Sequence, residues 1–163
     1  MSEGQRAPLP HAFHPPVAEF AVTSDDVTPG GVLKDAQVYA EGNVSPQLRW
    51  DGFPAETKSF AVTCFDPDAP TGSSVTDAGS GGFAGLPAGA THARNDYGSR
   101  DFGGAAPPAG DPAHRYVFTV YAVDTEKLGP DADTSPAAVG FNLRFHTLGR
   151  AQLVGEYAAP AAG

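Results

Sequence analysis

Cysteine is nearly absent from this sequence, because Cys64 is the only one in 163 residues. A single thiol cannot form an internal disulfide or an all-cysteine zinc site, and in mid-strand it is typical of a small buried side chain. Long apolar runs are absent as well: no stretch approaches the roughly 18 apolar residues of a transmembrane helix. We therefore expect neither a disulfide framework nor stable membrane insertion.

Basic residues are scarce, with 10 Lys and Arg against 19 Asp and Glu and a net charge of −9. This average charge repels a phosphate backbone, so we expect no nucleic-acid partner. A few directed donors can still outweigh the mean field in a local anion pocket. The first 16 residues contain no apolar stretch typical of a secretory signal, which predicts a cytoplasmic protein.

Turn-forming residues are abundant, with 20 Gly and 16 Pro. This composition disfavours a long helical bundle and favours short strands joined by structured loops. We expect a flexible proline-rich leader (1–16), one domain (17–158) and a tail (159–163). The histidines of the leader, His11 and His14, do not predict a metal site, and no metal or other cofactor is expected.

The order of β-prone segments predicts a mainly β, antiparallel, Greek-key-like structure with a peripheral helix. The segments are residues 17–23, 36–40, 47–50, 58–65, 115–123 and 151–157. Both faces of 115–123 are apolar, so this strand should lie in the middle of the sheet.

One late segment has the signals of a helix. Ser135 is a plausible N-cap, and Pro136 fits the first turn. Phe141, Phe145 and Leu148 then form a stripe with helical spacing. We expect this stripe to be the buried face.

Three motifs could carry chemistry: DPDAP at 66–70, GGAAPP at 103–108 and HRY at 114–116. Prolines can fix a turn that aims a carboxylate, and small residues let a ligand approach the backbone. Each motif is also typical of an ordinary turn or of a half-buried strand histidine, so none is specific alone.

The HRY motif places two directed donors on one strand face. His114 and Tyr116 are two residues apart, so both side chains project the same way. If Asp66 accepts a hydrogen bond from one ring nitrogen, it orients the imidazole and favours its charged form. The other nitrogen and the phenol could then bind one anion.

Taken together and in this order, the motifs resemble the phosphatidylethanolamine-binding protein family. The segment 42–50 is similar to the family's N-x-SP-x-L-x-W pattern. Asn142-Leu143, His146 and Gly155-Glu156-Tyr157 resemble its bacterial, Raf-kinase-inhibitor-like branch. The resemblance spans residues 17–158. It implies an antiparallel Greek-key β-sandwich with one or two small peripheral helices and a small anion-binding surface pocket.

The resemblance also implies which residues bind the ligand. Carried over position by position, they are Asp66, Pro70, Ala106, Pro107, Pro108, His114 and Tyr116.

One family feature is absent from the sequence. Members usually carry an aromatic–His strand soon after DPDAP, whereas here Ser74 runs directly into Val75, about a dozen residues short. The sequence therefore predicts no regular sheet pairing over 72–90. It also leaves open whether His92 replaces the lost histidine or a second copy of the chain fills the vacated edge as a homodimer.

Three functions fit these observations. The first is a non-enzymatic binding protein for phosphate, phosphoryl head groups or carboxylates. The alternative is a protein-interaction module that inhibits a kinase or protease. The third, an enzyme using Asp66 and His114 as acid and base, is disfavoured because no Ser or Cys nucleophile is recognisably placed beside His114. We expect no catalytic residue.

Overall fold

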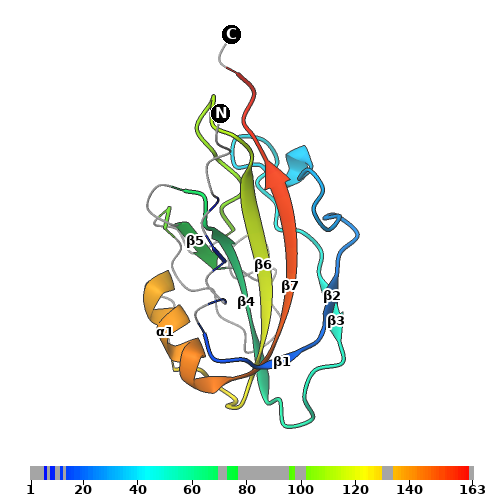
Figure 1. Cartoon of the computed structure of the whole chain (residues 1–163), viewed down its shortest axis with the longest axis vertical. Coiled ribbons are helices and arrows are strands. Elements are labelled where there is room, and N and C mark those ends of the chain that lie inside the picture. Colours follow the sequence, from blue (N-terminus) through cyan, green and yellow to red (C-terminus); the bar gives the residue numbers. More distant parts are fainter. Residues whose placement is uncertain are drawn as a thin grey trace.

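The computed structural model describes residues 6, 8–9, 12, 14–69, 73–76, 96–97, 102–129 and 134–161. Over these residues, the main sheet has the strand order β1-β7-β6-β4-β5, and β2 pairs with β3 in a second sheet (Figure 1). The strands are β1 (Ala18–Glu19), β2 (Ala21–Thr23), β3 (Arg49–Asp51), β4 (Ser59–Asp66), β5 (Ser73–Thr76), β6 (His114–Val123) and β7 (Thr147–Tyr157). The fold is mainly β, as predicted.

Strand β6 is the centre of the main sheet. It pairs antiparallel with β4 on one side and with β7 on the other. Val117, Val120 and Val123 are almost completely buried. The prediction of a central strand with two apolar faces is confirmed, and so are the strands on both sides of it.

The purely antiparallel prediction is wrong at the sheet edge, where β1 runs parallel to β7. The segment 17–23 forms two short strands, and Phe20 lies between them as the chain leaves the main sheet for the second one. Gly149 permits the close approach, since an added Cβ would lie 3.1 Å from the Ala18 carbonyl oxygen. The pairing of β1 with β7 therefore depends on a close approach of two backbone segments that are far apart in the sequence.

The strand predicted over 36–40 is also wrong. Asp35–Gln37 is a 3₁₀ helix, η2, closed by a 2.9 Å hydrogen bond from the Gln37 amide to the Lys34 carbonyl. Val38 then forms an isolated bridge with Ala105 and is buried. The apolar pattern therefore marks a buried turn.

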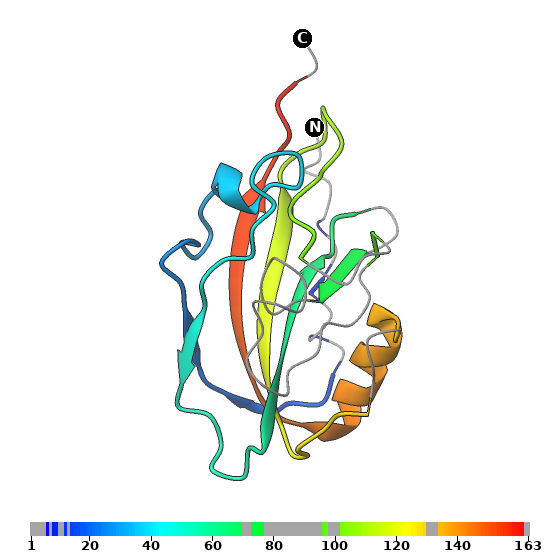
Figure 2. The ribbon, with the colours of Figure 1, turned by 180° about the vertical axis from the view of Figure 1, so that it is seen from behind.

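The helix α1 (Pro136–His146) begins as predicted, because the Ser135 side chain accepts a hydrogen bond from the Ala138 amide. The predicted buried face is wrong. Phe141 and Phe145 are 66% and 64% exposed, whereas Leu143 is buried with Val123. The helix ends at His146, and the next residue begins β7, so Leu148 belongs to a strand. Both views place α1 at the opposite edge from β2 and β3 (Figures 1 and 2).

The prediction of no sheet pairing over 72–90 is wrong for its first part. Strand β5 pairs antiparallel with β4, with Val75 opposite Cys64, and is the last strand on that side of the sheet among the described residues. The β-branched residues Val75 and Thr76 suit this short edge. The rest of the segment, 77–90, lies outside the described residues.

Candidate functional site

Two of the predicted motifs meet because β4 and β6 are neighbours. Phe65 is opposite Val117, so Asp66 at the end of β4 lies beside the start of β6. The Nδ1 atom of His114 is 2.8 Å from Oδ2 of Asp66, and these side chains are only 5% and 8% exposed. The structure therefore brings Asp66 and His114 into one buried hydrogen-bonded pair.

The DPDAP turn holds the Asp66 carboxylate in place. Its second oxygen, Oδ1, accepts hydrogen bonds from the backbone amides of Asp68 at 2.9 Å and Ala69 at 3.0 Å. A carboxylate that accepts local backbone donors forms a rigid turn. One carboxylate oxygen of Asp66 is therefore used by its own turn, and the other orients His114.

A second carboxylate, from Asp111, occupies the other side of the His114 ring. Its Oδ2 atom lies 3.0 Å from Nε2, and the Asp111 side chain is 40% exposed. Burial lowers the pKa of His114, but the hydrogen bonds and charges of Asp66 and Asp111 outweigh burial and raise it above its ordinary value. When the imidazole is charged, both of its ring nitrogens carry a proton and donate to these carboxylates. The Nε2 donor of His114, which we expected to bind an anion, is thus already hydrogen-bonded to Asp111.

A second ion pair reinforces the same turn. Arg115 donates to Asp68 through Nε at 2.9 Å, Nη2 at 2.7 Å and the backbone amide at 2.8 Å. The guanidinium hydrogen bond lowers the pKa of Asp68, against the opposing effect of burial. This bidentate pair ties DPDAP to HRY.

Tyr116 lies two residues along β6 from His114, on the same strand face. It is 5% exposed, and its buried hydroxyl donates no hydrogen bond to a described residue; the Ala106 backbone lies close enough to it to lower its pKa slightly. Burial, and next the negative charge of Asp66, raise the pKa of Tyr116 far above its usual range. The phenol therefore stays protonated and keeps an unused donor.

The GGAAPP segment lies against η2 and its flanking turn. Ala105 exchanges backbone hydrogen bonds with Gln37 and Tyr39, and the Gly104 amide donates to Oδ1 of Asn43 at 2.7 Å. Gly104 is required here, because an added Cβ would clash with the Gln37 carbonyl. This packing fixes the start of the segment on the protein body.

The predicted wall residues differ in accessibility. Pro107 is buried, whereas Ala106 and Pro108 are exposed. Ala106 and Pro108 are therefore accessible to a ligand that arrives from solvent, whereas Pro107 is not. Pro70 and His92 lie outside the described residues.

The sequence analysis did not name Asp111 or Tyr97, and it named Arg115 only as part of HRY. The hydroxyl of Tyr97 donates to the Gly104 carbonyl at 2.9 Å, and its ring stacks on Tyr39 with centroids 4.5 Å apart. Burial raises the pKa of Tyr97 to about 12. Asp111 and Arg115 adjoin or belong to HRY and could have been suspected, but nothing local marks Tyr97.

The other histidine predictions stand apart from this site. His146 pairs with Asp124 at 2.9 Å near the end of α1, and His14 lies at a separate hollow. Among the described side chains, no cluster of His, Cys, Asp and Glu has the arrangement of a metal site. Within the same residues, no helix has the length and apolar character to cross a bilayer.

Comparison with known proteins identifies relatives over most of the chain. The family model described as phosphatidylethanolamine-binding protein matches residues 23–158. Escherichia coli YbcL is 42% identical over 166 aligned positions, covering 89% of this chain and 91% of that protein. Escherichia coli YbhB is 42% identical over 154 positions, covering 82% of this chain and 97% of that protein. A Mycobacterium tuberculosis protein described as a candidate lipoprotein, LppC, is 31% identical over 168 positions, covering 88% and 82%.

The fold agrees with a solved structure. The crystal structure of Escherichia coli YbcL, described as a member of the mammalian PEBP family, superposes with a TM-score of 0.82. At 39% identity, the match covers 87% of this chain and 99% of that one. The aligned positions with YbcL and YbhB outnumber the residues that this chain contributes, so both relatives carry residues that it lacks within the matched region.

Proposed function

The chain belongs to the phosphatidylethanolamine-binding protein family, and on this premise we propose that it binds small anions at His114 without covalent chemistry. The ligand class is phosphate, a phosphoryl head group or a carboxylate. One observation carries the proposal: His114, held by Asp66, lies on the same strand face as Tyr116, whose buried hydroxyl donates to no described residue. Two donors of this kind suit one oxyanion.

Binding in this proposal begins with the departure of Asp111. Its carboxylate is 40% exposed, so solvent can replace the imidazole as its partner. The anion then takes the Nε2 position, while buried Asp66 keeps the ring oriented and charged. The phenol of Tyr116 supplies the second hydrogen bond. The protein's net charge of −9 opposes approach, but screening weakens this effect beyond about 8 Å at physiological ionic strength.

A binding role suits the contacts of His114 better than catalysis. Nδ1 of His114 is held by the buried Asp66 carboxylate, and Nε2 is paired with Asp111 rather than with a Ser or Cys nucleophile among the described residues. We therefore propose that the protein is not an enzyme. The interaction-module alternative stays a prediction from the family resemblance. The homodimer and the cytoplasmic location also stay predictions. A pull-down with and without competing phosphate distinguishes the module from the binding protein.

Titration calorimetry with phosphate and phosphorylethanolamine tests the proposal. We expect His114→Ala to weaken binding about ten-fold or more, because a charge-assisted hydrogen bond contributes about 1.5–3 kcal/mol and ~1.4 kcal/mol is a factor of ten. His146→Ala is the matched control, since it breaks another His–Asp pair of 2.9 Å elsewhere. Equal affinities for the parent and His114→Ala contradict the proposal.

A further inference from the structure

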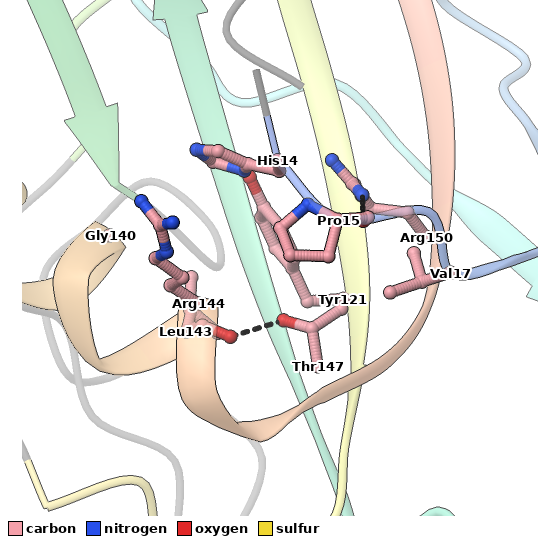
Figure 3. A pocket seen from close by; sticks show the side chains of 9 residues that line it. All are labelled: His14, Pro15, Val17, Tyr121, Gly140, Leu143, Arg144, Thr147 and Arg150. Atoms are coloured by element: carbon pink, nitrogen blue, oxygen red, sulfur yellow. Dashed lines mark hydrogen bonds between the residues drawn. The ribbon is translucent and has the colours of Figure 1, made fainter. Parts of the chain in front are cut away.

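A second hollow lies where the start of β7 meets the end of α1 and the chain segment before β1 (Figure 3). Its volume is about 50 Å³. Two guanidinium groups, those of Arg144 and Arg150, line it together with the His14 imidazole and Tyr121. No carboxylate belongs to its described lining. This concentration of positive charge is unexpected in a protein with only 10 Lys and Arg.

Arg150 has unused hydrogen-bonding capacity. Its Nη1 atom is buried and has no partner among the described residues. Its Nη2 atom makes only a long contact of 3.4 Å with the Pro15 carbonyl (Figure 3). A buried donor without a partner is costly, so Arg150 gains from an acceptor oxygen that comes within reach of its guanidinium group.

Arg144 reaches the same hollow from the last turn of α1 (Figure 3). Within the described part of the chain, neither Arg144 nor Arg150 has a carboxylate in ion-pair range. The end of a helix normally repels an anion through its free carbonyls. Here the Thr147 hydroxyl donates to the Leu143 carbonyl at 2.6 Å, so that acceptor is already used.

A neighbouring, wider hollow of about 490 Å³ shares His14, Val17 and Arg150 but also includes the Glu19 carboxylate. Glu19 would repel an anion placed there. Glu19 does not line the smaller hollow, and the size of that hollow limits its occupant to one small group.

We propose that the hollow between Arg144 and Arg150 is a second oxyanion site, separate from His114, for a single phosphate group. The two forked guanidinium groups match phosphate oxygens and supply several donors. Apolar contacts from Val17 and Leu143 line the rest of the hollow. Free phosphate and a phosphate monoester share this chemistry, so both serve as probes.

The test is an NMR titration of the whole chain with inorganic phosphate and with phosphorylethanolamine, following the side-chain Nε–H signals of both arginines. Arg144→Gln and Arg150→Gln should each weaken phosphate binding at this hollow about ten-fold or more. Arg144 is exposed on the helix surface, so its variant should fold even if the Arg150 variant does not. A response to inorganic phosphate alone excludes monoesters, and a response to both includes them.

Two controls separate this site from the others. Arg49→Gln makes the same change of charge at a distant exposed ion pair with Asp25 and should leave the affinity within about two-fold. His114→Ala should leave the response of Arg144 and Arg150 unchanged. Unmoved Arg144 and Arg150 signals in millimolar phosphate overturn the proposal, and so does an equal loss of affinity in Arg49→Gln.

Discussion

Replacing either carboxylate beside His114 by its amide removes one negative charge next to the same imidazole. The two changes should nevertheless have opposite effects on anion affinity. Asp111→Asn should tighten anion binding, and Asp66→Asn should weaken it. If the site responded only to net charge, both variants would bind an anion more tightly. The pair therefore tests whether Asp66 orients the ring and whether Asp111 competes with the ligand.

The expected magnitude for Asp111→Asn follows from its exposure. At 40% exposed, its contact with Nε2 is partly screened and contributes about 1 kcal/mol or less. An amide oxygen is a weaker competitor for the charged ring. Anion affinity should therefore rise by up to roughly five-fold.

The argument for Asp66→Asn follows from its two sets of contacts. The amide oxygen should keep accepting from the backbone of Asp68 and Ala69, which turns the NH₂ group toward Nδ1 of His114. Nδ1 must then accept, so the ring becomes neutral. The anion keeps an Nε2–H donor but loses the charge assistance, and its affinity should fall about ten-fold.

Titration calorimetry with phosphate, on both variants at one pH and ionic strength, measures the two signs directly. Thermal unfolding in the absence of phosphate checks that each variant is folded. Tighter binding by Asp66→Asn would refute the orienting role. Weaker binding by Asp111→Asn would instead show that Asp111 belongs to the binding site.

Three further predictions concern stability and the second donor. The pKa of His114 is raised on folding, so its stabilising effect should be full below about pH 6.5 and lost as the pH rises through the folded value; urea unfolding against pH should show this fall in the parent and less of it in His114→Gln. Tyr116→Phe removes a buried hydroxyl without a described partner, so calorimetry should show phosphate affinity reduced several-fold while the unfolding free energy falls by no more than about 0.5 kcal/mol. Leu143→Ala should cost about 2–5 kcal/mol of unfolding free energy and Phe141→Ala less than about 1 kcal/mol; equal losses would contradict the helix orientation.

Local sequence determined the elements whose signals are strong over many residues. The apolar faces of 115–123 predicted a central strand, the β-prone segment 58–65 predicted another strand, and Ser135-Pro136 predicted the start of α1. Period-two patterning also placed His114 and Tyr116 on one face of β6. These features depend on backbone propensity and on which strand face is apolar, and both can be inferred along the chain.

Tertiary packing decided what the local pattern left ambiguous. Phe141 and Phe145 have the spacing of a buried stripe, but α1 instead packs Leu143 with Val123. The parallel pairing of β1 with β7 depends on a backbone approach between residues far apart in sequence. The hydrogen bond from the Tyr97 hydroxyl to the Gly104 carbonyl also depends on the folded path of the chain, because no local sequence pattern indicates it.

The candidate site shows the same division. The sequence predicted that Asp66 could reach His114 if their strands were neighbours, and the fold meets this condition because Asp66 ends β4 and His114 begins the adjacent β6. The sequence could not predict that Asp111 occupies Nε2, since that contact depends on the path of the turn entering β6. Sequence determines which donors and acceptors a site contains, whereas the folded backbone decides which of them are already paired with one another.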